Sequence, residues 1–360
     1  MTAQLILQVK DGDPLGAVRG FLKTLLEENL VDALLIPLEV PSADQVTPIV
    51  VRDPQQLDSA NPLAPVMRVN AAAVLACLQR DIHSKNLGAV LRPCEMRAAI
   101  ELAKVGRIKL DRLTLISIDC MGTYEPDAYA QIARASVVSP TDEMLRWTRQ
   151  GPIAPYRLRN ACQMCEHFTA ENADIAIGLI GMNVREQLLI QTHAEIAERL
   201  HLTQGVSNGH EKAIARLGAI RHHRRQKALA NAMQMVNDLP SLFALVAPCT
   251  GCGECLDACP FCDTPALAPQ PSREPRTQRA HDWASGEMWH QHAYNLDAFT
   301  ALIEMGRHAA SCVGCGMCES ACPRHVPLTA LQAALGHKLQ EEFHYVPGRS
   351  VNEKLPWAMA

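Results

Sequence analysis

The sequence lacks a membrane span, a secretion signal and an excess of charge. No uninterrupted apolar run approaches the roughly 20 residues that a transmembrane helix needs. The first stretch, MTAQLILQVKDGDP, has no basic segment followed by a long apolar core, so we expect no signal peptide. The net charge of −4 gives no electrostatic reason to bind nucleic acid. We therefore expect a cytoplasmic protein that makes no direct membrane span and has no nucleic-acid partner.

Recognisable catalytic constellations are missing too. No G-x-G-x-x-G follows the first expected strand, so the sequence does not support a Rossmann dinucleotide site. No general acid–base pair and no nucleophile with its base stands out. We therefore predict no catalytic residue.

Cysteine, by contrast, is abundant. The chain has 360 residues, which suggests two or three domains, and its hydrophobic content of 48% is enough for a packed core. It contains 14 cysteines, and most of them fall in metal-type spacings. This pattern favours a reducing compartment and argues against a disulfide framework.

Two cysteine runs near the C-terminus carry the clearest signal. Both follow C-x2-C-x2-C-x3-C-P, the bacterial ferredoxin spacing for cubane iron–sulfur clusters. The first run is Cys249, Cys252, Cys255, Cys259 and Pro260, and the second is Cys312, Cys315, Cys318, Cys322 and Pro323. Since the fourth cysteine of each run usually binds the other cluster, the two runs imply each other. We expect one cluster on Cys249, Cys252, Cys255 and Cys322, and one on Cys312, Cys315, Cys318 and Cys259.

The loops of these runs contain glycines at matching places. Gly251, Gly253, Gly314 and Gly316 can adopt the positive φ angles that such tight loops need. Structural zinc is the alternative, but zinc sites use two separated cysteine pairs rather than a run of four. We therefore predict two 4Fe-4S clusters here.

The N-terminal half predicts an α/β fold. Residues 4–9 and 32–38 form strands around a helix over 15–29, which is a β-α-β unit and the start of a parallel sheet. Two more buried strands, over 87–91 and 113–118, flank a helix over 95–105. The fold class is thus an α/β N-terminal domain with a mostly parallel sheet, an α-helical linker and a C-terminal dicluster ferredoxin-type domain.

Four further cysteines suit a third cluster. Cys94 and Cys120 each follow a predicted parallel strand, and ligands collect at the carboxyl ends of such strands. Cys162 and Cys165 lie in a loop before the next strand. We predict a third 4Fe-4S cluster on these four residues. Two alternatives stay open, because Cys162 and Cys165 could be a redox dithiol and Cys94 a reactive thiol at a helix N-terminus.

Several residues carry weaker signals. Cys77, on the apolar face of a predicted helix over 70–85, is expected to be a small buried hydrophobe. Cys262 could be an alternative ligand or a buried thiol. The basic run 221–225 is interpreted as a solvated helix face, with an acidic partner or a phosphate-bearing cofactor as the alternative. Residues 264–294 predict a long inserted loop followed by a helix over 296–310, and Trp357 could contact a partner.

Taken together, the stretches around the third cysteine group resemble a known family. They are Arg92-Pro93-Cys94, the apolar strand before Cys120-x-Gly122, and Cys162-x-x-Cys165 followed by ADIAIG at 173–178. They look like the beta-subunit family of coenzyme F420 hydrogenases and dehydrogenases over roughly residues 12–205. Formate dehydrogenase beta subunits and chlorophyll-pathway reductases belong to this family, and a dicluster ferredoxin module is often appended. The resemblance implies that the family's own cluster falls on Cys94, Cys120, Cys162 and Cys165.

The same resemblance implies a flavin. Members are typically FAD-containing iron–sulfur proteins that pass electrons between clusters and a deazaflavin. This sequence departs from the family at two elements that resemble flavin-contacting segments. It has PLGAV at 14–18, where many members carry a Gly-Gly motif. Near ANPLAP at 60–65, where many members carry Gly-Ser/Thr-Lys-Tyr, it lacks the Lys-Tyr. We therefore expect a weakened or lost flavin site, and the residues that would bind such a cofactor are unknown.

These observations predict four segments and a function. The segments are a deazaflavin-dehydrogenase-beta-subunit-like domain with a cluster over 1–205, a helical linker over 206–240, a dicluster domain over 241–335 and a tail over 336–360. We predict a non-catalytic iron–sulfur electron-transfer subunit in a hetero-oligomer, with a molybdenum or tungsten formate dehydrogenase as its catalytic partner. The alternative is an FAD-containing reductase that exchanges electrons between the clusters and coenzyme F420 or a nicotinamide.

Overall fold

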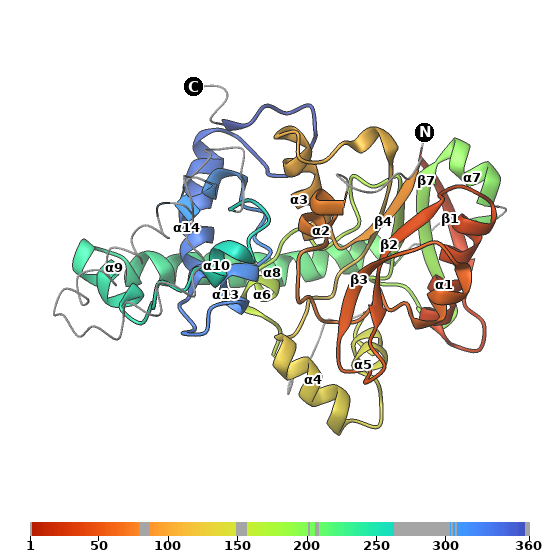
Figure 1. Ribbon diagram of the computed structural model, residues 1–360, viewed down its shortest axis with the longest axis horizontal. Coiled ribbons are helices and arrows are strands. Elements are labelled where there is room, and N and C mark those ends of the chain that lie inside the picture. The colour runs from red at the N-terminus through yellow and green to blue at the C-terminus, as the bar shows by residue number, and fades with distance from the viewer. Residues whose placement is uncertain are drawn as a thin grey trace.

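The fold joins a sheet domain to a cysteine-rich helical module. The computed structural model describes residues 2–78, 86–148, 157–200, 202–205, 209–262, 303, 305–306 and 308–356. The sheet and its covering helices form one end of the molecule, and the cysteine-rich helices form the other (Figure 1). The long helix α8 (His210–Met235) runs between the two (Figure 1). No helix in the described part of the chain is long and apolar enough to cross a membrane.

The strands form one mixed sheet in the order β3-β2-β4-β5-β6-β7-β1-β8. Their bounds are β1 (Thr2–Gln8), β2 (Ala33–Glu39), β3 (Val46–Val51), β4 (Leu87–Leu91), β5 (Leu113–Ile118), β6 (Ile175–Gly178), β7 (Gln187–His193) and β8 (Thr203–Gln204). The central strands β2, β4, β5 and β6 are parallel, whereas both flanks pair antiparallel. The predicted fold class is confirmed, with the parallel part at the centre of the sheet.

The first β-α-β unit differs from the prediction in one respect. β1 lies near the far edge of the sheet, between β7 and β8, and does not neighbour β2. Helix α1 (Pro14–Glu27) therefore belongs to a connection that crosses four intervening strands. The alternation of apolar residues predicts a strand and its buried face but does not specify which strand will be its neighbour.

The sheet is buried on both faces, as its continuous apolar strands require. Along β2 and β4 successive side chains alternate between two cores. Leu34, Ile36 and Val90 pack with α1 and with α7 (Ala194–Leu200) on one face. Leu35 and Ala89 pack with α2 (Ala71–Leu78) and α3 (Pro93–Lys104) on the other.

Local sequence signals begin the helices that matter for the site. Asp13 caps α1 by accepting from the Gly16 N–H at 2.9 Å, and Pro14 occupies the first turn. In α3 the Glu95 carboxylate accepts from the Arg92 N–H at 2.8 Å, and Pro93 again opens the helix. α3 thus begins directly after β4, which places Cys94 at the carboxyl edge of the sheet.

The remaining helices lie at the carboxyl edge of the sheet or in the cysteine-rich module. They are α4 (Pro126–Ala135), α5 (Pro140–Arg146), α6 (Asn160–Gln163), α9 (Leu239–Val246), α10 (Glu254–Asp257), α13 (Met317–Ser320) and α14 (Leu328–Glu342). Short 3-10 turns cover Pro54–Ser59, Leu110–Arg112 and Ala309–Ser311. All of the expected insertion over 264–294, most of the helix over 296–310, and Trp357 lie outside the described residues.

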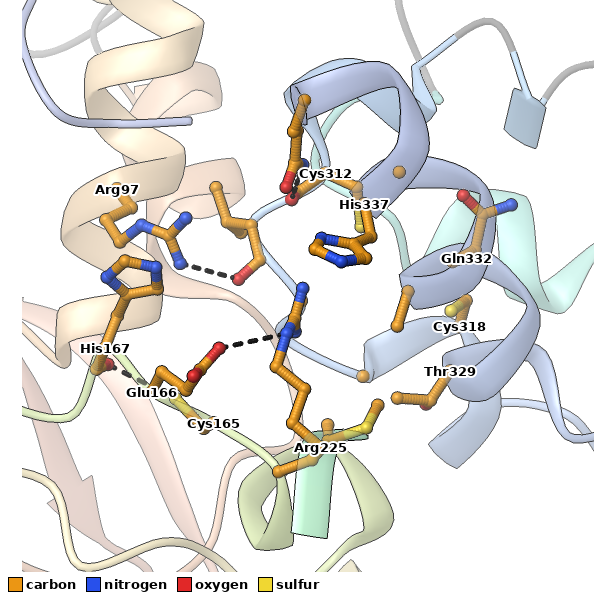
Figure 2. Close-up of a pocket in the computed structure, with 18 residues that line it drawn as sticks. Arg97, Cys165, Glu166, His167, Arg225, Cys312, Cys318, Thr329, Gln332 and His337 are labelled. Atoms are coloured by element: carbon orange, nitrogen blue, oxygen red, sulfur yellow. Dashed lines mark hydrogen bonds and ion pairs between the residues drawn. The ribbon is translucent and has the colours of Figure 1, made fainter. Parts of the chain in front are cut away.

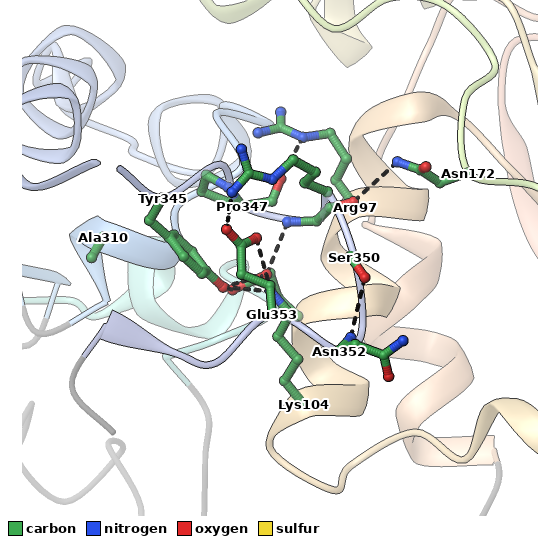
Figure 3. A network of polar contacts seen from close by, with 12 residues as sticks. Arg97, Lys104, Asn172, Ala310, Tyr345, Pro347, Ser350, Asn352 and Glu353 are labelled. Carbon is green, nitrogen blue, oxygen red and sulfur yellow. Dashed lines mark hydrogen bonds and ion pairs between the residues drawn. The ribbon is translucent and has the colours of Figure 1, made fainter. Parts of the chain in front are cut away.

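The segment after α14 returns to the sheet domain and packs on α3 (Figure 3). The buried Glu101 carboxylate accepts from Lys104 Nζ at 2.7 Å and from the Gly348 N–H at 2.8 Å. The Tyr345 hydroxyl lies 2.7 and 2.6 Å from its two oxygens. This network, the tail clasp of Glu101, Lys104, Tyr345 and Gly348, ties the end of the chain to the sheet domain.

Candidate metal centres

The second cysteine run lines a pocket with its expected partner from the first run. Cys312 and Cys315 lie in the loop before α13, Cys318 lies in α13, and Cys259 follows α10. All four line one pocket, together with Cys262 and apolar side chains that include Pro260, Phe261, Met305 and Val313. Burial raises the pKa of Cys315 to about 12, and the nearby Cys259 and Cys312 contribute to the increase. The structure thus brings together the four residues predicted for this cluster.

The first cysteine run also meets the residues expected to complete it. The pKa of Cys255 is raised to about 12. Burial is the main cause, and the charges of Cys249, Cys322 and Cys252 contribute to the increase. These are the four residues assigned from the spacing. Cys249, Cys255 and Cys322 pack against a small core whose buried members are Val246, Met305, Val326 and Leu328. Cys322, the fourth cysteine of the second run, therefore lies with the first three cysteines of the first run.

The four glycines predicted to take positive φ angles do so. The angles are +66° at Gly251, +77° at Gly253, +70° at Gly314 and +72° at Gly316. These turns direct backbone N–H groups toward sulfur. The Gly251 N–H lies 3.4 Å from Cys249 Sγ, and hydrogen bonds from the Gly314 and Met317 backbones reach Cys312 and Cys315. Such N–H donors stabilise thiolate charge.

The third group converges at the carboxyl edge of the parallel strands. Cys94 is in the first turn of α3, Cys120 follows β5, and Cys162 lies in α6 with Cys165 just beyond it. Burial raises the pKa of Cys94, with Glu95, Cys120, Cys315 and Cys165 adding to it. Burial likewise raises the pKa of Cys120 to about 11, and Cys162 is among its neighbours. The four residues predicted for a third cluster therefore lie together in one place.

Backbone contacts fix the loops that carry this group. The buried Asp119 carboxylate accepts from the N–H groups of Ala170, Leu179 and Ile180 at 2.9 to 3.1 Å. The Cys120 N–H donates to the Phe168 carbonyl at 2.8 Å. These bonds join the loop after β5 to the segment that follows Cys165, which holds Cys120 near the Cys162–Cys165 loop.

A buried arginine of the basic run lies beside the third group, and the sequence did not indicate that it is buried. Arg221 of α8 donates to the Met121 carbonyl at 2.8 Å and stacks on Phe168 with 4.6 Å to the ring centroid. It is 3% exposed, so the interpretation of the whole basic run as a solvated face is wrong at Arg221, although His222 to Arg224 are exposed. Only the tertiary fold reveals which residue of the run turns inward.

A further arginine joins the two halves of the molecule. Arg159 donates to Thr123 Oγ1 at 2.8 Å and to the Cys315 carbonyl at 3.1 Å. Thr123 also lies beside Cys162. The Thr123 backbone nitrogen is 3.4 Å from Cys162 Sγ, and the Thr123 hydroxyl oxygen is 3.3 Å from it. Burial acts to raise the pKa of Cys162, but Arg159 and Thr123 together lower it.

The third group lies next to the second run. Figure 2 shows a pocket lined by Cys165 and His167 from the sheet domain and by Cys312 and Cys318 from the cysteine-rich module. Arg97 reaches across and donates to the Val313 carbonyl at 3.0 Å. Burial, then Arg97 and Arg225, lower the pKa of His167 to about 3, so its imidazole is neutral. The two cysteine groups thus share a wall of the same pocket.

The donor sets fit 4Fe-4S clusters better than single ions. Among the described residues no three Cys, His, Asp or Glu side chains converge closely enough to hold one metal ion. A zinc ion with Zn–S bonds of about 2.3 Å needs tightly gathered sulfurs, whereas a cubane holds its four thiolates at separated corners. Each group here supplies four partly buried thiols, and the runs add apolar walls and N–H donors to sulfur.

Two single cysteines lie outside the three groups. Cys262 hydrogen-bonds with Cys259 and lines the pocket of the second run, so it is not an isolated buried thiol. Cys77 is exposed, which contradicts the expectation that it is buried. The sequence pattern misled there because Cys77 follows Leu75 and Ala76, the last buried residues of α2.

Comparison with known proteins agrees with this arrangement. The family model for the C terminus of the coenzyme F420 hydrogenase/dehydrogenase beta subunit matches residues 84–205, the range that contains the third cysteine group. The model "4Fe-4S dicluster domain" matches residues 246–326, the range of both runs. Over residues 84–205 the chain is therefore similar to the C-terminal part of these beta subunits. A dicluster domain follows this range, as the resemblance predicted.

Curated relatives match long stretches of this chain. It is 24% identical to an F420-dependent formate dehydrogenase subunit beta from Methanocaldococcus jannaschii, over 95% of this chain and 93% of that protein. It is 25% identical to F420-dependent formate dehydrogenase 1 subunit beta from Methanococcus maripaludis, over 58% of each chain. A chain of the F420-reducing [NiFe] hydrogenase complex from Methanosarcina barkeri is 13% identical with a TM-score of 0.49, over 66% of this chain and 94% of that chain.

Proposed function

We propose that this protein is the iron–sulfur electron-transfer subunit of a formate dehydrogenase complex, with three 4Fe-4S clusters. The observation that carries the proposal is the convergence of the predicted cysteines in three groups of four. The proposed ligands are Cys249, Cys252, Cys255 and Cys322; Cys312, Cys315, Cys318 and Cys259; and Cys94, Cys120, Cys162 and Cys165. When bound, such clusters accept and donate single electrons at potentials that the surrounding protein tunes.

The arrangement of the groups supports a linear route. The group of the sheet domain borders the second run, since Cys315 is among the neighbours that raise the pKa of Cys94 after burial. The second run in turn borders the first, since Cys255 is among the neighbours that raise the pKa of Cys318. The second-run group is therefore the middle position. The residues of this chain bind, bury and space the three sites, while chemistry at formate belongs to a partner.

The partner follows from the relatives rather than from this chain. Curated relatives are named as beta subunits of F420-dependent formate dehydrogenases, which favours a hetero-oligomer with a separate catalytic subunit. We propose a molybdenum or tungsten formate dehydrogenase as that subunit, and a cytoplasmic location, because the fourteen cysteines are free. We further propose the division into 1–205, 206–240, 241–335 and 336–360, which keeps each matched region within one segment.

An FAD-containing reductase is the second candidate, because two relatives are named F420-dependent. The N-terminus of α1 fits a flavin pyrophosphate poorly. The Asp13 carboxylate already accepts the Gly16 N–H there, at 2.9 Å, and it adds negative charge where an anion would need free N–H groups. This observation favours a pure electron-transfer subunit.

Anaerobic purification with iron, sulfide and flavin assays tests the proposal. We expect about twelve irons per chain and no flavin, from three cubanes. Cys94→Ser should lower the iron content to about eight, while Cys77→Ser, at the exposed cysteine outside the three groups, should leave it unchanged. About eight irons in the unaltered protein, insensitive to Cys94→Ser, would exclude the third cluster, and stoichiometric FAD would favour the reductase.

Co-purification tests the assignment of the partner. A tagged copy of this chain, isolated anaerobically from its own cells, should carry with it a protein that contains molybdenum or tungsten and oxidises formate. Recovery of a nickel–iron hydrogenase subunit instead would contradict the formate dehydrogenase assignment while leaving the electron-transfer role intact.

A further inference from the structure

Arg159 lies at the junction of the two modules and is almost fully buried. It is the residue that precedes α6, and only 3% of its surface is exposed. On one side lies the third cysteine group of the sheet domain, and on the other lies the loop of the second run. An arginine in this position needs partners for every N–H of its guanidinium group.

All of its nitrogens find such partners, and they come from both modules. Toward the sheet domain, Nε donates to Thr123 Oγ1 at 2.8 Å and Nη2 lies 3.9 Å from Cys162 Sγ. Toward the cysteine-rich module, Nη2 donates to the Cys315 carbonyl at 3.1 Å. Nη1 lies 3.2 Å from Ser320 Oγ and 3.5 Å from Met317 Sδ. The fork is therefore held rigidly between the two cysteine groups.

Sulfur atoms, rather than a paired carboxylate, lie against its guanidinium group. Among the described residues no carboxylate forms an ion pair with Arg159. Burial acts to lower the pKa of Arg159, but the charges of Cys162, Cys94 and Cys315, and also of Glu125, raise it above its usual value. A buried cation without compensation would be strongly destabilising, so the cysteine groups on both sides stabilise it.

We infer that Arg159 is a positioning residue that bridges the third cysteine group and the second run and raises the reduction potentials of the clusters on both. This inference rests on the three-cluster function proposed above. Reduction adds one negative charge to a cluster, and a nearby buried cation stabilises that charge strongly because the surroundings have a low dielectric constant. Since the same guanidinium contacts both groups, one substitution alters two clusters.

The test is an EPR-monitored redox titration of the full-length protein, purified anaerobically, with iron content measured in parallel. Arg159→Gln removes the charge, and we expect lower midpoint potentials for the third-group and second-run clusters and an unchanged potential for the first-run cluster. Arg159→Lys keeps the charge but loses the fork, so both shifts should be smaller. Arg134→Gln, which removes an exposed positive charge paired with Asp44, should leave all three potentials unchanged.

Unchanged potentials in Arg159→Gln with full iron content would overturn the inference. If that variant loses iron, Thr123→Val decides instead, because it removes the acceptor that holds Arg159 Nε. Among the described residues, Thr123 contacts sulfur only at Cys162, so a lower potential at the second-run cluster must be transmitted by Arg159. In Thr123→Val, a change of potential confined to the third-group cluster would overturn the role of Arg159. The control Thr123→Ser keeps the hydroxyl, so its potentials should match those of the unaltered protein.

The iron content of the unaltered protein separates this inference from the function on which it depends. About eight irons would mean that the third cluster is absent and that the proposed function fails. About twelve irons, with potentials that do not respond to Arg159→Gln or Thr123→Val, would overturn the bridge alone.

Discussion

At the scale of residues, buried and partly buried arginines offset the charge that the cysteine groups gather. Arg97, Arg159 and Arg221 donate to the backbone carbonyls of Val313, Cys315 and Met121, each next to or within a cysteine group. Carbonyl partners leave the positive charge of these arginines available to the thiolates. Burial lowers the pKa of Arg97, and Cys165, Cys94 and Cys312 oppose that effect. Cysteine and arginine thus stabilise each other in partly buried surroundings.

Cys262 gives a prediction at the same scale. It hydrogen-bonds with Cys259 and has Cys318 and Cys312 as neighbours, so its thiol is available at the pocket of the second run. Cys259→Ser should therefore retain the second-run cluster, with Cys262 as the replacement ligand and an altered EPR spectrum. The double variant Cys259→Ser/Cys262→Ser should lose about four irons.

A matched control comes from the first run, where the nearest thiols are already proposed ligands. Cys249→Ser should lose about four irons as a single substitution, because no spare cysteine replaces it. Equal iron loss in Cys259→Ser and the double variant would show that Cys262 does not substitute.

At the scale of elements, short helices bring the two modules into close contact. Gly316 caps α13 with a φ of +72°, and a Cβ placed on it would overlap the Cβ of Ala161 in α6. α6 carries Cys162, and α13 carries Cys318. The close approach of these two helices is therefore what places the third cysteine group beside the second run.

Gly316→Ala should disrupt this contact. A left-handed alanine costs about 1–2 kcal/mol, and the overlap with Ala161 adds a second cost that the helices can relieve only by moving apart. Gly314→Ala is the matched control, because its φ of +70° imposes the same backbone cost while nothing lies within 4 Å of the added Cβ. We expect a lower midpoint of thermal unfolding in both, and a larger decrease in Gly316→Ala with an altered third-cluster spectrum. Equal effects would mean that the contact between α6 and α13 is not tight.

At the scale of the whole molecule, the chain closes on itself. α8 leaves the sheet domain and packs against α14, and the segment after α14 returns to α3 through the tail clasp (Figures 1 and 3). The modules are therefore joined by a connecting helix, by Arg97 and Arg159, and by the end of the chain. Three separate connections explain how two cysteine groups from different modules keep a fixed relative position.

Tyr345→Phe tests the tail clasp. It removes a donor from the buried Glu101 carboxylate, and leaving such a group short of a partner costs about 1–3 kcal/mol. We expect a lower midpoint of thermal unfolding and faster proteolysis of the segment after α14. Arg349→Gln, which removes an ion pair at a half-exposed arginine of the same segment, should cost less than about 1 kcal/mol. Equal effects of the two substitutions would contradict the clasp.

The clasp also predicts a dependence on pH. Burial first, and then Glu101, raise the pKa of Tyr345 in the folded protein. A raised folded-state pKa means that the contribution to stability is complete below the unfolded value of about 10 and declines as the pH rises above it. Unfolding of the unaltered protein should therefore become easier above about pH 10, and Tyr345→Phe should reduce this decline.

Much of the fold could be predicted from local patterns. The strands over 87–91 and 113–118 match β4 and β5 residue for residue, because continuous apolar runs between turn residues are typical of buried parallel strands. The glycine conformations in both cysteine loops followed from spacing. Local patterns did not predict the position of β1, the exposure of Cys77 or the burial of Arg221. Each of these depends on which distant element packs against it.

The sequence by itself determined the chemistry available to this protein, since the cysteine spacings and the loop glycines limit what a tight loop can bind. It also determined where the central strands β2, β4 and β5 and the helices α1 and α3 lie, because hydrophobic periodicity acts locally. Only the tertiary structure decided that the group at Cys94 lies beside the second run, and that Arg159 and Thr123 occupy the space between. That space is formed by segments far apart in the chain, whose contacts are set by packing and by the need to pair a buried charge.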